Sequence, residues 1–583
     1  MIEKMTKYSF ILLNRENEGF LEKLSELGVM DITRSTKPID ERSAEMLAGA
    51  DSLGRRISLL ENENWMHDEQ YAALINEKEE AERAFAERKP WGECDREKIA
   101  GLEKNGILFH YYIIPEKKYD PQWEEQSAAS VVCRKDGKVW LVVATPEGQE
   151  PDIPFKESAR PTSTLAEEEM RINGLTAAIA QREEVLNDER ENLPALKAEF
   201  ASRKHELDLY WAKATGTHAA ENHLVVYEGF APTESDKSLE AELDKSGAFW
   251  FREAAVTEDN PPIKLKNNKF VKMFEVLTDM YGRPDYNEFD PTPYISIFFL
   301  LFFAMCMGDA GYGLLLIIGG ILLRKVDSFK DMAPLITTLG VATFLVGIVM
   351  HTFFGVDIAA LPWIPSWLKA VMITGTIGGF EAQMVLSLAI GIVHLCLAMV
   401  VKTVYATRNQ GFLGSLGVWG WTLLIVGGVI LAAVGMLKVI PAGIMKWIVI
   451  ALGVVSALGI FLFNDIHRNP LKNIGSGLWE TYNTVTGLLG DVLSYLRLYA
   501  LGLAGGMLGK AFNDIAAMTL GDGGFGFGWL AFVLILVIGH ALNLAMCCLG
   551  AFVHPLRLNF LEFFKNSAYD GKGRKYQPLG NNN

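Results

Sequence analysis

Two arginines lie within apolar stretches that are long enough to cross a membrane. Arg497 lies deep in the stretch from 480 to 518. Arg557 lies in the stretch from 526 to 564, near the C-terminal end of that stretch. A charged side chain inside a bilayer is costly and is a functional hypothesis by default. Arginine stays protonated at every accessible pH, so it cannot relay protons, but it can hold a passing carboxylate in its ionised form. Arg557 has a second interpretation, because a long side chain near a helix end can extend its charge to the interface.

The chemistry of such an arginine is control of ion binding through charge. Two unit charges 4 Å apart interact by about 4 kcal/mol at an effective dielectric constant near 20, which lowers a carboxyl pKa by roughly three units. A carboxylate would release its ion beside the arginine and reload elsewhere. Asp309 and Glu381 lie near the ends of apolar stretches, and Asp491 is six residues from Arg497. We therefore favour a carboxylate on another subunit, with Asp491 as an internal alternative.

Further polar residues share helix faces with the two arginines, because residues three or four apart lie on one face. Packing also selects small residues, but it explains neither the arginines nor the histidines. Glu562 follows Arg557 by five residues, off its stripe, as an interfacial charge or as part of an aqueous inlet. The first stripe is Asn483, Gly487, Gly490, Ser494 and Arg497, and the second is His540, Asn543, Cys547, Gly550, His554 and Arg557.

The elements that must position these residues are membrane helices, which need about 20 apolar residues each. The apolar stretches are 335–356, 382–403, 413–437, 443–464, 480–518 and 526–564, the last two long enough to be tilted. Residues 294–323 fit either one span or a tight hairpin, because MGDAGYG at 307–313 interrupts them. With a hairpin, most lysines and arginines fall on the side of the N-terminal half, as the positive-inside rule describes. We therefore predict eight spans.

The positions behind this asymmetry form two sets. The side of the N-terminal half receives Arg324, Lys325, Lys330, Lys402, Arg408, Arg468, Lys472, Lys565, Lys572, Arg574 and Lys575, and the opposite side receives Lys369, Lys438, Lys446 and Lys510. The sequence MIEKMTKYSFILL at the N-terminus lacks a signal-peptide layout. We therefore expect cytoplasmic N- and C-termini, whereas a single span at 294–323 would place the two termini on opposite faces.

The N-terminal half, residues 1–290, is charged and acidic, whereas residues 291–583 hold only 12 of the 70 acidic and 17 of the 55 basic residues. Apolar residues in the N-terminal half recur at coiled-coil spacing in two arms at about 43–88 and 163–212. Short strand patterns lie near 1–40, 100–150 and 222–256. The predicted fold is mostly α, with a cytoplasmic coiled-coil strut of about 65 Å, from 1.5 Å per residue, two small α/β lobes and a polytopic helical membrane domain.

Several classes of function are disfavoured by what the sequence lacks. A phosphate-binding loop requires GxxxxGK[ST], and the nearest approach, around Gly509 and Lys510, has Ala504 and Ala511 at required positions. We expect no nucleotide site, no cofactor and no metal, and nucleic acid is an unlikely ligand for the acidic half. The cysteines Cys94, Cys133, Cys306, Cys396, Cys547 and Cys548 show no metal-ligand or disulfide spacing and are interpreted as thiols.

The motifs DVLSYLRLYALGLAG at 491–505 and GHALNLAMCCLGAFVHPLRLNFLEFF at 539–564 resemble the last two membrane helices of subunit a, or subunit I, of V-type and A-type rotary ATPases. The resemblance runs in order over about the last 320 residues and is weaker before them, where VYEGFAP at 226–232 has Phe230 and Ala231 in place of Trp and Val. Further similar stretches are KLKNNKFVKMFEVLTDMYGRPDYNEFDPTPY at 264–294, MGDAGYG at 307–313 and LSLAIGIVH at 386–394.

This resemblance implies a non-catalytic stator subunit of a bacterial inner-membrane V/A-type ATPase, which couples rotation of a c-type ring to H⁺ or Na⁺ translocation through two half-channels. It implies peripheral stalks, lipid and, indirectly, the central stalk and ATPase sector as partners. Arg497 takes the place of the family's essential arginine and Arg557 that of the second arginine. The half-channel candidates are Asp491, Ser494, His540, Asn543, His554 and Glu562, the last at an acidic position of some bacterial members.

Two departures from the family pattern concern the half-channel route and the ion. Cys547 and Gly505 stand where eukaryotic members carry an acidic residue and a histidine. An autonomous secondary transporter with a cytoplasmic regulatory domain is the alternative, but it predicts repeated halves, and no convincing repeat is visible. A membrane-anchored scaffold would leave both arginines unexplained.

Overall fold

The computed structural model describes residues 1–35, 37–93, 96–126, 128–160, 163–221, 223–326, 329–362, 364–438, 440–463, 470–520 and 527–580. Cys94 and Arg468 therefore lie outside the described residues. The other five cysteines, Cys133, Cys306, Cys396, Cys547 and Cys548, are free. The chain divides into two compact units, Ser35–Trp211 and a second unit that combines Met1–Arg34 with the chain from Ala212 onward.

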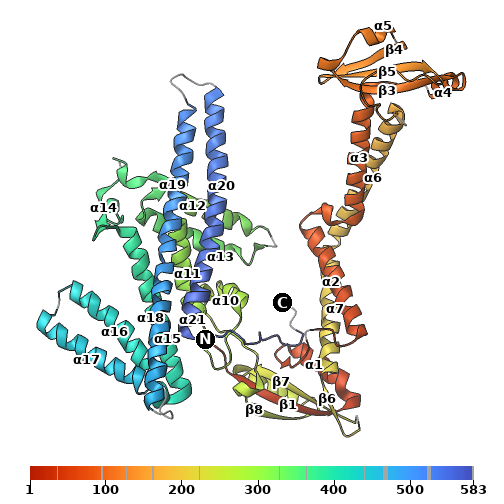
Figure 1. Ribbon diagram of the computed structural model, residues 1–583. Helices are drawn as coiled ribbons and strands as arrows, with labels where there is room; N and C mark the ends of the chain where they lie inside the picture. Colours follow the sequence, from red (N-terminus) through yellow and green to blue (C-terminus); the bar gives the residue numbers. More distant parts are fainter. Residues whose placement is uncertain are drawn as a thin grey trace. The chain divides into compact units, whose positions relative to one another are not determined.

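The unit Ser35–Trp211 consists of paired helices and a three-stranded sheet (Figure 1). Helix α3 packs along α6, and Gly54 of α2 lies against the Phe200 ring of α7. The antiparallel sheet has the order β3-β5-β4. The elements are α2 (Glu41–Glu61), α3 (Glu69–Arg88), α4 (Arg96–Lys104), β3 (Ile107–Pro115), α5 (Gln122–Gln126), β4 (Ala128–Lys135), β5 (Lys138–Pro146), α6 (Leu165–Glu191) and α7 (Leu193–Ala214).

Each helical arm is broken into two helices rather than continuous. Asp68 caps α3 by accepting a hydrogen bond from the Tyr71 amide (3.0 Å), and it also binds Arg56 (2.7 Å) and Arg182 (2.8 Å). A hydrogen bond from Arg182 leads the interactions that hold the pKa of Asp68 below its usual range. The break between α2 and α3 thus buries a carboxylate that three donors satisfy. Ile179 and Leu186 of the predicted seven-residue repeat are buried.

In the second unit, the chain's N-terminal strand and segments more than 200 residues away form one antiparallel sheet of order β2-β7-β1-β8, with β6 beside β7. Tyr8 and Phe10 of β1 are buried on one face of the sheet, and Tyr8 donates to Asp236 (2.9 Å). The elements are β1 (Met5–Leu13), α1 (Asn17–Leu27), β2 (Asp31–Ile32), β6 (Thr217–Ala219), β7 (Leu224–Pro232), α8 (Asp236–Leu243), β8 (Phe249–Ala254), α9 (Lys269–Lys272) and α10 (Glu275–Tyr281).

Long apolar helices make up the rest of this unit, and among the described residues five helical stretches are long and apolar enough to cross a membrane. Three shorter apolar helices of 16, 14 and 17 residues precede them. The elements are α11 (Thr292–Met307), α12 (Ala310–Leu323), α13 (Ala333–Val349), α14 (Ser366–Lys369), α15 (Ala382–Gly414), α16 (Leu416–Met436), α17 (Ala442–Phe461), α18 (Pro470–Ser494), α19 (Leu496–Met518), α20 (Phe527–Arg557), a π-helical turn (Leu558–Phe563) and α21 (Phe564–Ser567). Two short hairpins, β9 (Thr352–Phe353) with β10 (Val356–Asp357) and β11 (Thr376–Ile377) with β12 (Phe380–Glu381), lie between α13 and α15.

The ambiguous segment 294–323 forms two helices that are separated at Gly308, whose φ of +58° is left-handed. Asp309 then caps α12 by accepting from the amides of Gly311 (2.8 Å) and Tyr312 (3.2 Å). Helix α12 packs along α13, while α11 packs against α13, α19 and α20. The chain direction therefore changes between α11 and α12, and eight crossings stay a prediction.

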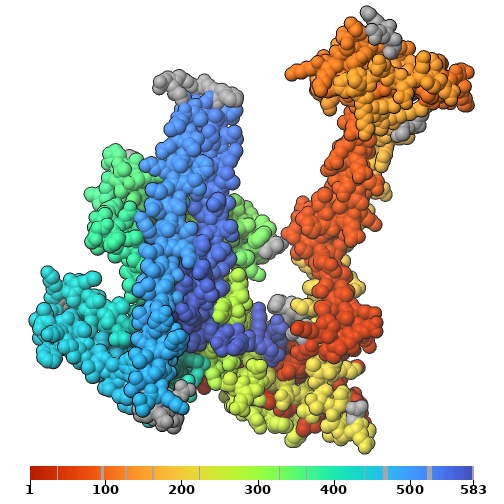
Figure 2. Space-filling view, viewed as in Figure 1, coloured from red at the N-terminus to blue at the C-terminus, as the bar shows by residue number. Residues whose placement is uncertain are grey.

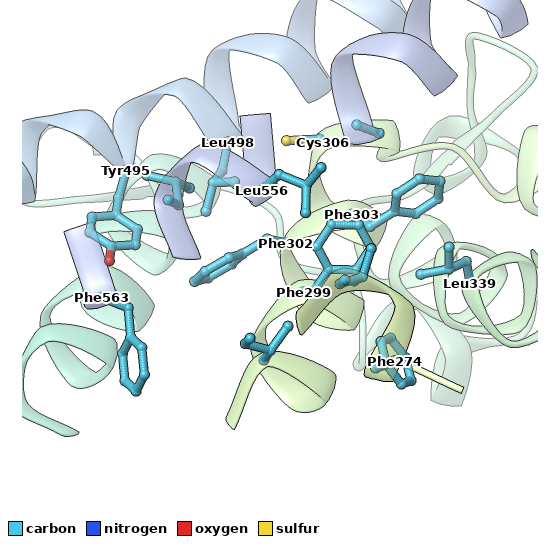
Figure 3. Close-up of a cluster of buried hydrophobic side chains, with 14 of the residues drawn as sticks. Phe274, Phe299, Phe302, Phe303, Cys306, Leu339, Tyr495, Leu498, Leu556 and Phe563 are labelled. Carbon is cyan, nitrogen blue, oxygen red and sulfur yellow. The ribbon is translucent and has the colours of Figure 1, made fainter. Parts of the chain in front are cut away.

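The core of the membrane region is an aromatic cluster around α11 (Figure 3). Phe299, Phe302 and Phe303 of α11 are buried together with Tyr495 and Leu498, at the start of α19. This cluster holds α11 against the helices that carry Arg497 and Arg557. The site is thus built on packed helices rather than on loops.

The last described residues, 569–580, here called the C-terminal tail, return to the N-terminal sheet. Ile263 pairs with Lys575, and the Leu579 amide donates to the Met30 carbonyl (2.8 Å). Arg574 lies 3.5 Å from the buried carboxylate of Asp31. The two ends of the membrane region, near residues 291 and 569, therefore contact the same α/β lobe, the one that contains the N-terminal sheet and is called the lobe below.

Candidate functional site

Arg497 lies at the start of α19, next to an exposed apolar face. Its side chain is partly buried, and its buried Nη1 lacks a hydrogen-bond partner among the described residues. Leu493 one turn earlier is 52% exposed, and Met507 further along α19 is 64% exposed. The surfaces of α18 and α19 form one continuous column in Figure 2. A buried charged donor without a hydrogen-bond partner is costly.

Arg557 ends α20 and is exposed. His554 lies one turn earlier, within electrostatic range of both Arg497 and Arg557. The second polar stripe therefore runs along the side of α20 that faces α19, where Gly550 approaches Leu501 and a Cβ on Gly505 would lie 2.7 Å from Cys547 Sγ. His554 therefore lies between the exposed Arg557 and the partly buried Arg497 in its electrostatic surroundings.

The predicted internal counter-ion of Arg497 is engaged elsewhere. Asp491 binds Lys565 Nζ (3.2 Å) and accepts from the Asn566 amide group (2.9 Å). Glu562 lies beside Ser494 and within electrostatic range of Asp491, and its side chain is buried, with Oε2 lacking a hydrogen-bond partner among the described residues. The structure thus brings Asp491, Ser494 and Glu562 together near the end of α20.

Glu562 is buried because the helix changes its geometry there. Pro555 lies inside α20, and the chain forms a π-helical turn over Leu558–Phe563. A proline removes a backbone donor and favours such local irregularity, and π-turns inside helices are frequent at functional sites. The extra residue per turn rotates Glu562 toward α18. The sequence contained this signal in Pro555, but helical phase extrapolated from Arg557 missed it.

His540 and Asn543 belong to a hydrogen-bonded network farther along α20. His540 Nδ1 lies 2.8 Å from the Tyr312 hydroxyl and its Nε2 lies 3.0 Å from Asn513 Oδ1. The Asn543 amide donates to the Tyr312 hydroxyl (2.8 Å) and to the Gly505 carbonyl (2.9 Å). The network joins α12, α19 and α20, and it includes two residues, Tyr312 and Asn513, that sequence reasoning did not select.

The two ends of α19 therefore carry separate polar groups. Asp491, Ser494 and Glu562 lie beside its first residues, toward the lobe, whereas Tyr312, His540 and Asn543 lie beside its second half. Arg497 lies between them.

A second pair missed from the sequence is His394 and Tyr495. Both are fully buried, and His394 Nδ1 lies 2.9 Å from the Tyr495 hydroxyl. The His394 ring stacks on Phe563 at 4.7 Å with an interplanar angle of 8°. This pair connects α15 to Tyr495, two residues before Arg497, and to the π-helical turn, so it helps to position both.

Comparison with known proteins agrees with the motifs. The description "V-type ATPase 116kDa subunit family" belongs to the family model that matches residues 153–335 and 478–580. A-type ATP synthase subunit I of Pyrococcus abyssi is 34% identical over 55% of this chain and 48% of its own length. The corresponding protein of Methanocaldococcus jannaschii is 33% identical over 60% and 54%. The chain thus spans about half the length of these archaeal relatives.

Bacterial relatives align over the whole chain at lower identity. V-type ATP synthase subunit I 1 of Treponema pallidum is 24% identical over 99% of this chain and 100% of its own length. The similarity includes the helices of both arginines and extends into the N-terminal half. The chain is therefore similar to the V-type ATPase 116kDa subunit family and to subunit I of A-type and V-type ATP synthases.

Proposed function

We propose that the chain is the non-catalytic membrane stator subunit of a V/A-type rotary ATPase and couples rotation of a c-type ring to H⁺ or Na⁺ movement. The observation that carries this proposal is Arg497: a guanidinium with a buried, unsatisfied donor beside an exposed apolar face. A ring carboxylate passing that face would pair with it, release its ion and move on.

Two half-channels follow from the distribution of polar groups around Arg497. The cluster of Asp491, Ser494 and Glu562 is on the lobe side and serves the cytoplasmic half-channel, with Arg557 and His554 on the path from it. His540 and Asn543 lie on the opposite side of Arg497 and serve the outward half-channel. Separation of the two groups along α19 supports this assignment, because a continuous polar path would let ions leak without rotation.

The C-terminal tail supports an even number of crossings. Residues 291 and 569 border the membrane region, and both ends contact the lobe that contains the N-terminus: Met1 pairs with Asp290, and Gln577 donates to Asp31 (2.8 Å). An odd number of crossings would place these ends on opposite sides of the bilayer. Eight crossings, with the three short helices included, satisfy this condition, and the lobes remain in the cytoplasm for stalk binding.

Native gel electrophoresis of gently solubilised membranes tests this assignment against an autonomous transporter. A stator subunit migrates with the ring and the ATPase sector, far above the 64.7 kDa of the chain, and ATPase activity appears in the same band. Migration near the mass of one or two copies of the chain, with ATPase activity elsewhere, would favour the secondary transporter and contradict the proposal.

A further inference from the structure

A cavity of about 520 Å³ lies along α19 on the side of the membrane region that is far from the lobe. Helix α11 begins next to the lobe and ends at Met307, and the cavity is lined by Met305 and Gly308 at that far end. The segment between α13 and α15, which includes both short hairpins, supplies its opposite wall. The cavity is therefore on the outward side under the topology proposed above.

The floor of the cavity is close to Arg497. Leu498 and Tyr499, the next two residues of α19, line the cavity together with Gly502. Arg497 itself lies within electrostatic range of Cys306, the neighbour of the lining residue Met305. Figure 3 shows Leu498 and Cys306 at one edge of the aromatic cluster. The cavity therefore reaches the residue that follows Arg497 in α19.

Several polar and charged side chains stand among the apolar residues that line the cavity. Tyr499 donates to the Glu381 carboxylate, which is exposed to the cavity. His351 Nδ1 lies 3.0 Å from Asp357, and its Nε2 lies 3.3 Å from the Gln383 amide. Lys510 is the other charged lining residue. A volume of this size holds several water molecules, at about 30 Å³ each, and the lining offers them hydrogen-bond partners.

We propose that this cavity is the outer chamber of the outward half-channel, and that Glu381, held by Tyr499, is the carboxylate that attracts the transported monovalent cation into it. The inference rests on the proposed stator function and adds the place of entry and its charged group. A cation drawn to Glu381 moves through water along the Tyr499 and Gly502 face of α19 to the boundary formed by Leu498. There it meets the ring carboxylate after that carboxylate has passed Arg497.

Two glycines of α19 line the cavity. A Cβ on Gly502 would lie 2.6 Å from the Met305 carbonyl oxygen, so a side chain there would push α11 and α19 apart. Gly506 faces Thr352 at ordinary van der Waals distance. Gly502 therefore allows α11 to pack closely on α19 at the edge of the cavity.

The test uses the intact ATPase complex in membrane vesicles, with three variants: Glu381→Gln, Thr374→Cys in the cavity lining, and Val371→Cys as a matched control on the same segment but outside the lining. ATP synthesis is driven by an imposed membrane potential while the H⁺ or Na⁺ concentration on the outward side is varied. We expect Glu381→Gln to raise the half-saturating outward cation concentration by about tenfold, since charged clefts concentrate ions by factors of 10 or more. The maximum rate and the dependence on the cytoplasmic side stay unchanged.

A positively charged, membrane-impermeant thiol reagent supplies the second readout. Applied from the outward side, it blocks ion movement in Thr374→Cys and leaves Val371→Cys and the parent protein unaffected. Equal responses of the two cysteine variants, together with an unchanged outward dependence in Glu381→Gln, would overturn the chamber. Arg497→Gln is assayed in parallel: if it loses coupling while the chamber variants behave like the parent, only this inference fails, whereas coupled transport in Arg497→Gln rejects the stator function itself.

Discussion

Asp309 and Arg497 are charged residues in the same apolar helix bundle, but their hydrogen bonding differs. The Asp309 carboxylate is 1% exposed and accepts hydrogen bonds from four backbone amides, those of Gly311, Tyr312, Phe354 and Gly355, at 2.8–3.2 Å. Arg497 retains an unsatisfied donor. A buried charge that has hydrogen-bond partners within the protein stabilises the structure. A buried charge that lacks them is costly unless a ligand or another subunit pairs with it.

Substituting Asp309→Asn should therefore destabilise the protein. The amide offers one acceptor oxygen and turns an NH₂ group toward backbone donors, so we expect a loss of about 2–4 kcal/mol, because hydrogen bonds to charged groups contribute about 1.5–3 kcal/mol each. Thermal unfolding of the purified complex measures this change. Asp514→Asn, at an exposed position of α19, is the control, and equal melting temperatures for the two variants would contradict the structural role of Asp309.

At the residue scale, the sequence predicted side chains that share a helix but missed side chains that meet across helices. The steps of three and four found Arg497 and the stripe that contains His540 and Asn543. They could not find Tyr312 or Asn513, because these two residues contact His540 from other helices. Tyr312 is 228 residues from His540 in the sequence, and Asn513 is 27 residues from it. The same limitation left Asp491 as an alternative partner for Arg497, although its partner Lys565 is 74 residues away.

At the scale of elements, contact between α19 and α20 depends on small residues. A Cβ on Gly505 would lie 2.7 Å from Cys547 Sγ. We expect Gly505→Ala to destabilise the complex by about 1–3 kcal/mol, the usual cost of overpacking. Adding Cys547→Ala removes the sulfur and should restore most of that loss in thermal unfolding.

Gly453→Ala in α17 is the matched control, because a Cβ there meets nothing within 4 Å. It should have little effect or a small stabilising one, since alanine favours helix. Destabilisation by Gly453→Ala as large as that by Gly505→Ala, or failure of the double variant to recover, would contradict the close-contact explanation.

The C-terminal tail should respond to pH through Asp31. Burial raises the pKa of Asp31 to about 6, although Arg574 and the Gln577 amide oppose the shift. Undocking of the tail returns the carboxyl to water and to its ordinary pKa, so docking is strongest at low pH and weakens as pH rises through 6. The full effect is about 3 kcal/mol, or roughly a hundredfold in docking equilibrium.

Hydrogen–deuterium exchange of the Gln577 and Leu579 amides, corrected for intrinsic rates, measures this dependence between pH 5 and 7.5. Protection should fall with rising pH in the parent protein and become independent of pH in Asp31→Asn, while the Phe10 amide of β1 changes in neither. Protection that is constant or increases with pH in the parent protein would contradict the role assigned to Asp31.

Element boundaries were partly predictable. The break in MGDAGYG was visible because glycine and aspartate favour a helix end and a cap, and both occur there. The break in the second arm was missed because its seven-residue apolar repeat continues through the break to Leu193, and the break in the first arm was missed although its apolar spacing ends at Leu60. Asp68 ends one arm segment through ion pairs with Arg56 and Arg182, the latter from the other arm, so the determining contacts are not local.

At the scale of the whole molecule, the composition change near residue 290 predicted a membrane region after it, and the structure has its long apolar helices there. It could not predict that the C-terminal tail crosses back to the lobe, because the contacts of Asp31 with Arg574 and Gln577 join residues more than 540 positions apart. Such contacts leave no local periodicity.

Single cysteines test the crossing number. Lys572→Cys, in the tail, should react with an impermeant thiol reagent only from the cytoplasmic side, because an even number of crossings separates residue 291 from the tail. Val371→Cys follows the three helices α11, α12 and α13 and should therefore react only from the opposite side. Inverted and right-side-out vesicles of the same cells provide the comparison. Labelling of both positions from one side would contradict the eight-crossing topology.

The most direct measurement of the central claim is ATP-driven ion uptake into inverted vesicles by Arg497→Gln and by Leu493→Gln, the latter one turn away on the same exposed face, at matched assembly. A sodium ionophore and a protonophore identify the transported ion. The account predicts that Arg497→Gln loses uptake although the complex assembles and Leu493→Gln retains most of it. Undiminished uptake in Arg497→Gln would show that the arginine is structural and would contradict the coupling role proposed for this chain.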